Sequence, residues 1–158
     1  MRKIQVLLLL ILSQIVYSQV KETDELYKTA KKLDSLIFDI GFNACDLSHY
    51  HAIISDDLEF YHDKGGITSG EKAFTASIKN NICGGPNKVK RELIPNSMKV
   101  YPLYKNKVLY AFIEEGEHDF SEWYQGKWNR GSRAKFTILW ILDGKDWKMK
   151  RVLSYDHQ

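Results

Sequence analysis

The apolar side chains follow two different periods, three to four residues in the first half of the chain and two residues in the second. Apolar positions at steps of three and four share one face of a helix, whereas positions at steps of two share one face of a strand. The first period predicts helices over residues 23–40 and 46–54, and a third that opens at the capping-box pattern Thr68-x-x-Glu71 and ends at Gly84-Gly85. Alternation predicts strands at residues 58–63, 88–94, 97–104, 107–120, 133–143 and 146–155, with a loop over residues 121–132.

The order of these elements indicates the fold class. Helices that precede a run of strands joined by tight turns are typical of an α+β fold, whereas parallel α/β folds alternate strands with helices. The sequence therefore predicts three N-terminal helices packed on an antiparallel sheet. No repeat or linker interrupts residues 19–158, so we expect a single domain there.

The first 18 residues have the composition of a signal peptide. A cationic start at residues 1–3 precedes an apolar run over residues 4–12, and Val16 and Ser18 are small enough for the positions before a cleavage site. The alternative is a transmembrane anchor, but a bilayer core needs about 20 apolar residues and this run is shorter. We expect cleavage before Gln19 and a periplasmic or secreted protein that no longer contacts the membrane.

The charge balance changes once this leader is removed. The full chain carries 23 basic and 20 acidic side chains, and without Arg2 and Lys3 the balance is 21 against 20. The remaining charges are interleaved, and the short basic run of Lys88, Lys90 and Arg91 reads as a solvated edge. The sequence therefore predicts no nucleic-acid partner, and export argues against a cofactor such as NAD or ATP.

Cys45 and Cys83 both lie in the portion predicted to be exported. An even cysteine count in an oxidising compartment favours a disulfide between them. The alternative is a pair of buried free thiols that pack as small apolar side chains.

Four strings in the predicted mature chain resemble a known superfamily. They are D-D-L-E-F-Y-H-D at 56–63, G-E-H-D-F at 116–120, A-K-F-T-I-L-W at 134–140 and W-K-M-K-R-V-L-S-Y-D-H at 147–157. Together with the element order they resemble the nuclear transport factor 2-like superfamily of SnoaL-like cyclases and ketosteroid isomerases, and most closely an exported bacterial branch that carries no settled activity. The resemblance implies a strongly curved, cone-shaped sheet of the cystatin-like roll type, with a cavity between helices and sheet. A shared fold does not imply a shared reaction.

Strand alternation predicts which polar side chains face that cavity. Trp147, Met149 and Leu153 share a phase with three polar residues of the last strand, namely Arg151, Tyr155 and His157. By the same argument Glu114, His118 and Trp140 face inward from the two preceding strands. We therefore expect His62, Glu114, Trp140 and Arg151 to bind a ligand. The alternative is that Arg151 and Glu114 form an ion pair that closes the cone with no ligand involved.

The sequence leaves three hypotheses for the function of the domain. In the first, the domain binds a small, partly apolar molecule. In the second, it is a proton-transfer enzyme of the isomerase, cyclase or dehydratase type, with His118 or His157 as base and Tyr155 as oxyanion donor. In the third, the outer face of the sheet forms a homodimer. The alternative to a functional role is, for each histidine taken alone, that it is a surface residue with no function.

The histidines offer little to a metal. His49 and His51 are placed on a helix, where positions two apart diverge by about 200° and cannot share an ion. His62, His118 and His157 could converge only through the fold, and the chain contains no H-E-x-x-H or C-x-x-C pattern. The sequence predicts no metal site.

Overall fold

The computed structural model describes residues 19–158, so the predicted signal peptide lies outside the described residues. The helical segments are α1 (Glu25–Ser35), which continues as η1 (Leu36–Asn43), α2 (Tyr50–Ile53), and α3 (Glu71–Ser77), which continues as η2 (Ile78–Cys83). The strands are β1 (Ile54–His62), β2 (Gly66–Ser69), β3 (Val89–Leu93), β4 (Lys99–Lys105), β5 (Val108–Tyr124), β6 (Lys127–Asp143) and β7 (Asp146–Tyr155). None of the helices in this range is long and apolar enough to cross a membrane.

All seven strands join one sheet in the order β2-β1-β7-β6-β5-β3, with β4 also paired to β5. The α+β prediction is confirmed, and so is the hairpin after the first strand, which β1 and β2 form. The sheet differs from the expected meander at two pairings. β3 pairs with β5 and not with β4, and β1 runs parallel to β7. The parallel pairing of β1 with β7 places the C-terminal ends of the two strands side by side, so two distant parts of the sequence lie together.

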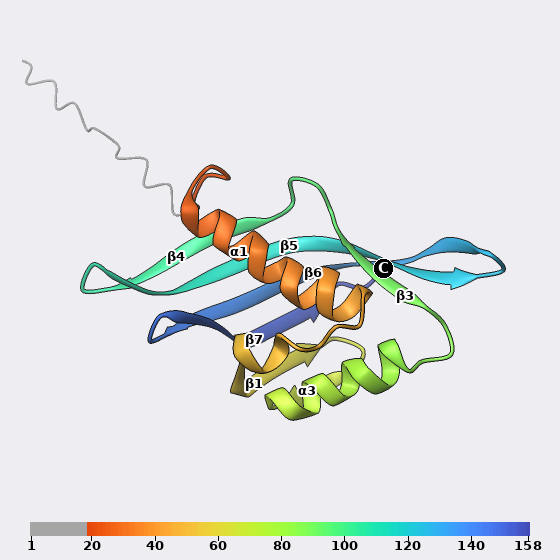
Figure 1. The fold of residues 1–158 in the computed structure, drawn as a ribbon. Helices are drawn as coiled ribbons and strands as arrows, with labels where there is room; N and C mark the ends of the chain where they lie inside the picture. The colour runs from red at the N-terminus through yellow and green to blue at the C-terminus, as the bar shows by residue number, and fades with distance from the viewer. Residues whose placement is uncertain (1–18) are drawn as a thin grey trace, which may run out of the picture.

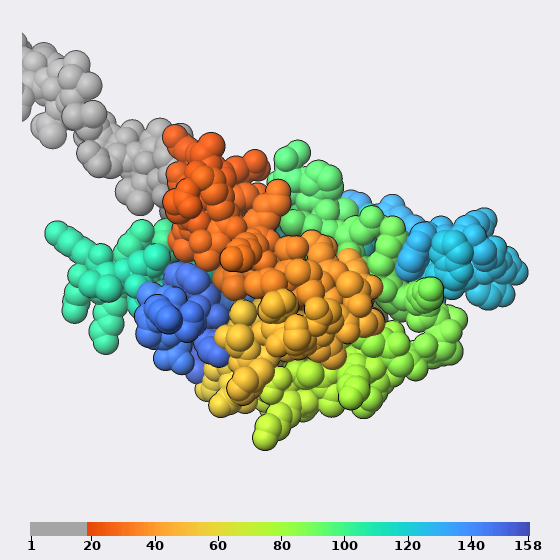
Figure 2. Space-filling model, viewed as in Figure 1, coloured from red at the N-terminus to blue at the C-terminus, as the bar shows by residue number. Residues whose placement is uncertain are grey.

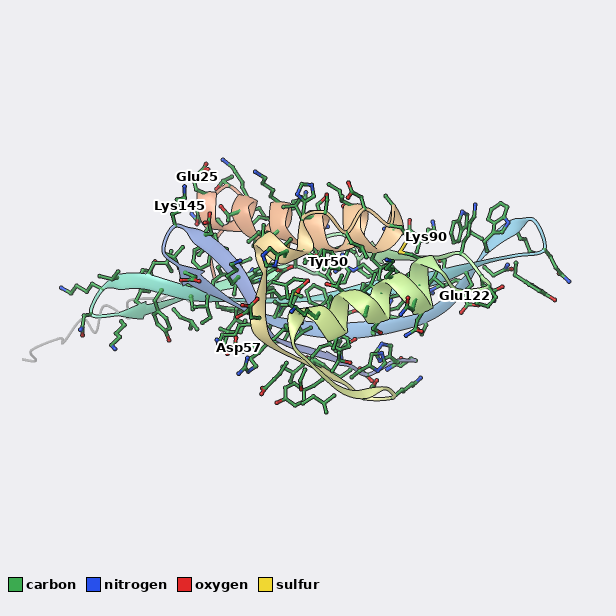
Figure 3. The ribbon with its side chains drawn as sticks, turned by 60° about the horizontal axis from the view of Figure 1, so that its bottom comes forward. Glu25, Tyr50, Asp57, Lys90, Glu122 and Lys145 are labelled. Atoms are coloured by element: carbon green, nitrogen blue, oxygen red, sulfur yellow. A yellow bond between two sulfur atoms is a disulfide. The ribbon has the colours of Figure 1, made fainter. Side chains whose placement is uncertain are left out.

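The helices lie on one face of the curved sheet (Figure 1), and the core fills the space between them. Tyr50 lies between α1 and α3 in Figure 3, and its hydroxyl donates to the Ile37 carbonyl at 2.8 Å. Gly41 is required here because a Cβ at this position would overlap the Tyr50 ring. The close approach lets η1 settle against the short α2.

Three predicted elements differ from the structure. The helix expected over residues 46–54 is reduced to the single turn α2. The expected loop at 121–132 is instead a hairpin, in which β5 and β6 continue to a tight turn at Gln125-Gly126 that projects past the helices (Figure 2). The predicted capping box is not formed, since Gly70 precedes α3 and the Glu71 side chain bonds to the Thr75 hydroxyl at 2.7 Å.

The disulfide between Cys45 and Cys83 is confirmed. It joins the segment after η1 to the last residue of η2, and its sulfur atoms are drawn in yellow in Figure 3. The bond therefore links the end of the first helical segment, α1 with η1, to the end of the second, α3 with η2.

Candidate functional site

A cavity of about 470 Å³ lies between η1, α3 and η2 on one side and the sheet on the other. Its wall is mainly apolar and includes Phe38, Phe42, Phe60, Phe74, Ile78, Ile82, Val89, Phe120, Phe136 and Val152. Its polar groups include His62, Lys64, Glu122, Ser154, His118 and His157. An apolar cavity with a few polar groups is typical of small-molecule sites.

A buried ion pair supports the floor of this cavity. The Arg91 guanidinium donates two hydrogen bonds to Asp34, both at 2.8 Å, and the Arg91 side chain is 1% exposed. Asn43 holds this part of β3 against η1 by exchanging two hydrogen bonds with the Arg91 backbone, at 2.7 and 2.8 Å. The guanidinium also lies 3.9 Å from the centre of the Phe38 ring. The prediction that Arg91 belongs to a solvated edge is therefore wrong.

The same arginine determines the state of His118. Arg91 Nε donates to His118 Nδ1 at 2.9 Å, and since an arginine nitrogen can only donate, Nδ1 must be the acceptor. The neutral ring then carries its proton on Nε2, a buried atom with no hydrogen-bond partner among the described residues. Burial, and then the Arg91 charge, lower the pKa of His118 to about 3. At neutral pH His118 is a fixed hydrogen-bond donor and not the general base of the second hypothesis.

Glu114 and Trp140 lie behind the cavity wall. Trp140 Nε1 donates to Glu114 Oε2 at 2.8 Å, and both side chains are fully buried. Burial, and then the negative charge of Asp34, raise the pKa of Glu114 well above its usual value. Burial raises the pKa of Asp34 too, but the bidentate contact with Arg91 opposes this shift, so we assign the charge to Asp34 and the proton to Glu114. The predicted inward orientation of Glu114 and Trp140 is confirmed, while neither is among the residues that line the cavity.

At the mouth of the cavity the end of β1 meets the end of β7. His157 Nδ1 lies 2.6 Å from Asp63 Oδ1, and the His157 backbone N–H donates to Asp63 Oδ2 at 3.2 Å. Burial alone would raise the pKa of Asp63, but these two hydrogen bonds outweigh it and lower the pKa. A carboxylate can only accept, so Nδ1 of His157 carries a proton, and in the neutral ring Nε2 has a free lone pair.

His62 and His157 meet as the sequence suggested. Their rings stack with centroids 4.3 Å apart and planes 17° apart. His62 Nδ1 accepts the backbone N–H groups of Lys64 and Gly65, both at 3.1 Å. Burial, and then the neighbouring His157, lower the pKa of His62.

His62, Asp63 and His157 also place three metal-ligand atoms within 4.8 Å of one another. A metal ion bound to an imidazole lies close to the plane of the ring, about 2 Å from the nitrogen. Two nearly parallel, stacked rings cannot both meet this condition with one ion. The group therefore fits a hydrogen-bonded pair with a stacked neighbour better than a metal centre.

Arg151 and Tyr155 do not face the cavity, and the prediction that they do is wrong. Trp140 pairs with Met149 while Leu139 pairs with Arg151, so Lys150 is an extra residue in β7. One extra residue moves every later side chain of a strand to the opposite face. Arg151 consequently pairs with Glu59 at 2.7 Å, and Tyr155 is 40% exposed on the outer face. The expected ion pair between Arg151 and Glu114 is therefore not formed.

The structure thus brings together three of the predicted site residues, His62, His118 and His157. It adds Asp34, Arg91 and Asp63, which the sequence did not single out for the site. Asp34 and Arg91 are far apart in sequence. Each lies in phase with apolar positions of its own element, but neither element shows the partner that allows the charge to be buried. Asp63 had a signal, because it follows β1 directly, but its partner was not evident until the parallel pairing of β1 with β7 was known.

No protein-family model matches this chain, and no curated protein matches it in sequence. Solved structures do resemble it. A nuclear transport factor 2-like protein from Cytophaga hutchinsonii is 13% identical, with a TM-score of 0.60 over 85% of this chain and 98% of that one. A protein with a cystatin-like fold from Caulobacter vibrioides is 12% identical, with a TM-score of 0.64 over 83% of this chain and 89% of that one.

A third similar structure, a protein from Catenulispora acidiphila in complex with S-DNPA, is 8% identical, with a TM-score of 0.65 over 84% of this chain and 92% of that one. Identities this low establish the fold and not the reaction. The described residues adopt the cone-shaped, cystatin-like fold of the nuclear transport factor 2-like proteins.

Proposed function

We propose that this chain binds a small, partly apolar molecule in the helix–sheet cavity, and that His118 Nε2 donates a hydrogen bond to an acceptor on that ligand. The observation that carries the proposal is the buried Nε2 with no partner among the described residues. Leaving a buried donor without a partner costs about 1–3 kcal/mol. A ligand carbonyl or ether oxygen would remove this cost.

The surroundings of His118 support a neutral, preorganised donor. Arg91 holds the ring from Nδ1 at 2.9 Å, and Phe136 stacks on its face with centroids 5.1 Å apart. Gly116 gives Phe136 the room to do so, because a Cβ there would lie 2.7 Å from the Phe136 ring. The ring is therefore fixed before any ligand enters. The neighbour in complex with S-DNPA supports small-molecule binding by this fold.

A matched pair of probes tests the proposal. Acetophenone and ethylbenzene have similar shapes, and only acetophenone has a carbonyl acceptor. We expect calorimetry to show tighter binding of acetophenone by about 5- to 10-fold, the equivalent of one hydrogen bond. In His118→Asn the amide oxygen can still accept from Arg91, while the shorter side chain has no donor at the position of Nε2, so this preference should disappear.

His51→Asn is the control, because His51 is exposed and lies outside the cavity. Equal binding of the two probes by the unaltered protein would contradict the role of His118. Native mass spectrometry of protein from its own exported fraction would in addition report a co-purified ligand.

A second function, proton transfer, is favoured by the 2.6 Å contact between Asp63 and His157. Asp63 holds the His157 ring so that Nε2 is free to take a proton from a bound carbonyl compound. His118 replaces Tyr155 as the oxyanion donor, because Tyr155 lies on the outer face. Deuterium exchange at the acetophenone methyl group, followed by NMR, should be faster with the protein than in buffer. His157→Gln should abolish the acceleration.

We also propose that the chain is exported with cleavage before Gln19. The disulfide supports this, because such bonds persist in oxidising compartments. An intact mass of the exported protein that starts at Gln19 is the expected result. A mass that retains residues 1–18 would contradict it.

A homodimer through the sheet remains a proposal. Its support is a group of exposed apolar side chains on the outer face, where Tyr61, Ile67, Leu153 and Tyr155 are each at least 40% exposed. Light scattering at micromolar concentrations should report a dimer, and a monomer throughout would exclude it.

A further inference from the structure

Ser154 lies beside the His157–Asp63 pair and faces the same cavity. Its hydroxyl oxygen is 3.4 Å from His157 Nε2, the nitrogen that Asp63 leaves free. Ser154 is 6% exposed and belongs to the cavity wall, because the extra residue in β7 turns Val152 and Ser154 inward. A serine hydroxyl can donate to such a nitrogen, so the three side chains form a chain from carboxylate to imidazole to hydroxyl.

Backbone contacts hold the three residues in place. Asp63 N–H donates to the Ser154 carbonyl at 3.0 Å, across the parallel pairing of β1 and β7. Asp156 has a φ of 59°, a left-handed conformation that turns His157 back over Ser154. Beyond it, Arg133 and Gln158 exchange two backbone hydrogen bonds, at 2.9 and 3.1 Å. The arrangement therefore does not depend on the side chains alone.

We propose that Ser154 is the nucleophile of an ester-hydrolysing site, with His157 as its base and Asp63 as the residue that orients His157. The proposal rests on the cavity proposed above as the binding site, and it adds a covalent step that binding does not require. The residues act by their roles and geometry, since the same constellation occurs on unrelated folds and in any chain order. The mainly apolar wall favours an ester with an apolar acyl group.

The reaction balances with water as the only co-reactant. Ser154 Oγ forms a bond to the ester carbonyl carbon as its proton passes to His157 Nε2, and the carbonyl oxygen takes the negative charge. When the carbon–oxygen bond to the leaving alcohol breaks, the alcohol takes the proton from Nε2. Water then attacks the acyl-serine with His157 again as base, and the products are the free acid and Ser154.

Two features of the site agree with this chemistry. The Nε2–H of His118 is an unpartnered donor on the same cavity and is available to the carbonyl oxygen. The 3.4 Å separation of Ser154 from His157 is longer than a strong hydrogen bond, and such contacts are often long before substrate binds.

An ethyl fluorophosphonate probe tests the nucleophile directly, because it phosphonylates an activated serine with loss of fluoride. We expect intact-protein mass spectrometry to show one adduct, and peptide mapping to place it on Ser154. With 4-nitrophenyl butyrate, release of 4-nitrophenolate should exceed the buffer rate, and Ser154→Ala should return it to that rate. Asp63→Asn should slow labelling by about 100-fold or more, because the imidazole tautomer is no longer held.

Ser69→Ala is the control, since Ser69 is exposed on β2 and lies outside the cavity. It should label and hydrolyse as the unaltered protein does. Circular dichroism of Ser154→Ala should match the unaltered protein, and Ser154→Cys, labelled with iodoacetamide at a rate that falls in His157→Gln, tests the same contact independently.

An adduct elsewhere, or ester hydrolysis that is unchanged in Ser154→Ala, would overturn the proposal. If acetophenone still binds through His118 while Ser154 is not labelled, the nucleophile fails and the binding function stands. If neither occurs, both fail.

Discussion

Two polar groups reach the same cavity, one through His118 and the other through His157 and Ser154, and they differ in how completely their hydrogen bonds are satisfied. In the buried group, Asp34, Arg91 and His118, every side-chain nitrogen and oxygen has a hydrogen-bond partner among the described residues except His118 Nε2. The mouth group, Asp63, His157 and Ser154, is partly exposed at Asp63 and has a long contact at its inner end. The buried group therefore fixes the position of one donor, His118 Nε2. The mouth group contains a base and a hydroxyl between which a proton can move.

The difference predicts opposite responses to mutation. Breaking the buried group should cost stability because a charge is left unpaired in the core. Altering the mouth group should change chemistry and leave the fold almost unaffected, because water can solvate what is exposed.

The largest expected effect follows from Arg91→Met. Asp34 would remain buried without its cation, and we expect the free energy of unfolding to fall by about 3–5 kcal/mol. Urea denaturation followed by tryptophan fluorescence measures this. Lys28→Met is the control, because the Lys28–Glu25 ion pair is largely exposed and should contribute less than about 1 kcal/mol.

The double variant Asp34→Leu with Arg91→Met sharpens the point. It removes both charges, so much of the lost stability should return. If the double variant were as unstable as Arg91→Met, the stability lost in Arg91→Met would not come from the unpaired charge of Asp34.

Removing the disulfide should have the next largest effect. Cys45 and Cys83 are 38 residues apart, and Cys45→Ala with Cys83→Ala should lower the free energy of unfolding by about 2–4 kcal/mol. Since the bond joins the segment after η1 to the end of η2, and both η1 and η2 line the cavity, acetophenone affinity should fall as well. Reduction of the unaltered protein should reproduce both losses, and a reduced protein of unchanged stability would contradict the prediction.

The pH dependence of stability tests the assigned state of His118. Its pKa is about 3 in the folded protein and about 6.5 when unfolded. Unfolding therefore takes up a proton below pH 6.5, so this contribution is fully present above that pH and is lost as the pH falls toward 3. Between pH 7 and pH 5 the loss should be about 2 kcal/mol.

His118→Asn isolates this contribution. Glu114, with its raised pKa, contributes with the opposite sign, because its stabilisation is present below pH 4.5 and is lost as the pH rises. Subtracting the pH profile of the asparagine variant cancels Glu114 and every other shared group. A difference that is flat from pH 7 to pH 5 would mean that His118 is not held neutral.

The sequence was informative where strands are regular. In β5 and β6 the alternation predicted the inward positions of Glu114, His118 and Trp140 correctly, because these parts of the two strands pair without interruption. In β7 the alternation failed beyond Met149, since one extra residue reverses the faces and nothing in the sequence around Lys150 marks it. For this reason Arg151 and Tyr155, which were predicted to face the cavity, face outward, and Ser154 faces the cavity instead.

Charged residues were the second source of error. Arg91 alternates in phase with Val89 and Leu93, and Asp34 lies on the same face of α1 as Ala30. A charged side chain with no visible partner is nevertheless expected in solvent. Each is buried only because the other is there, 2.8 Å away. Periodicity gives the face of the element on which each residue lies, but the pairing between them depends on the tertiary fold, and neither element alone reveals it.

The smallest expected effect on stability follows from Asp63→Asn. Asp63 is partly exposed, and an amide at this position can still bond to the His157 ring. We expect the free energy of unfolding to change by less than about 1 kcal/mol. The tautomer of His157 should change more, because an amide can donate to Nδ1 as well as accept from it, whereas the carboxylate can only accept.

Long-range ¹H–¹⁵N NMR spectra of the imidazole rings measure this tautomer directly. In the unaltered protein at neutral pH, Nε2 of His157 should be the unprotonated nitrogen, and in Asp63→Asn the two tautomers should be mixed. His118 provides the internal control, because Arg91 and not Asp63 sets its tautomer. If Asp63→Asn instead lost several kcal/mol, Asp63 would be a structural residue like Asp34, and the division between a rigid donor and a movable base would no longer hold.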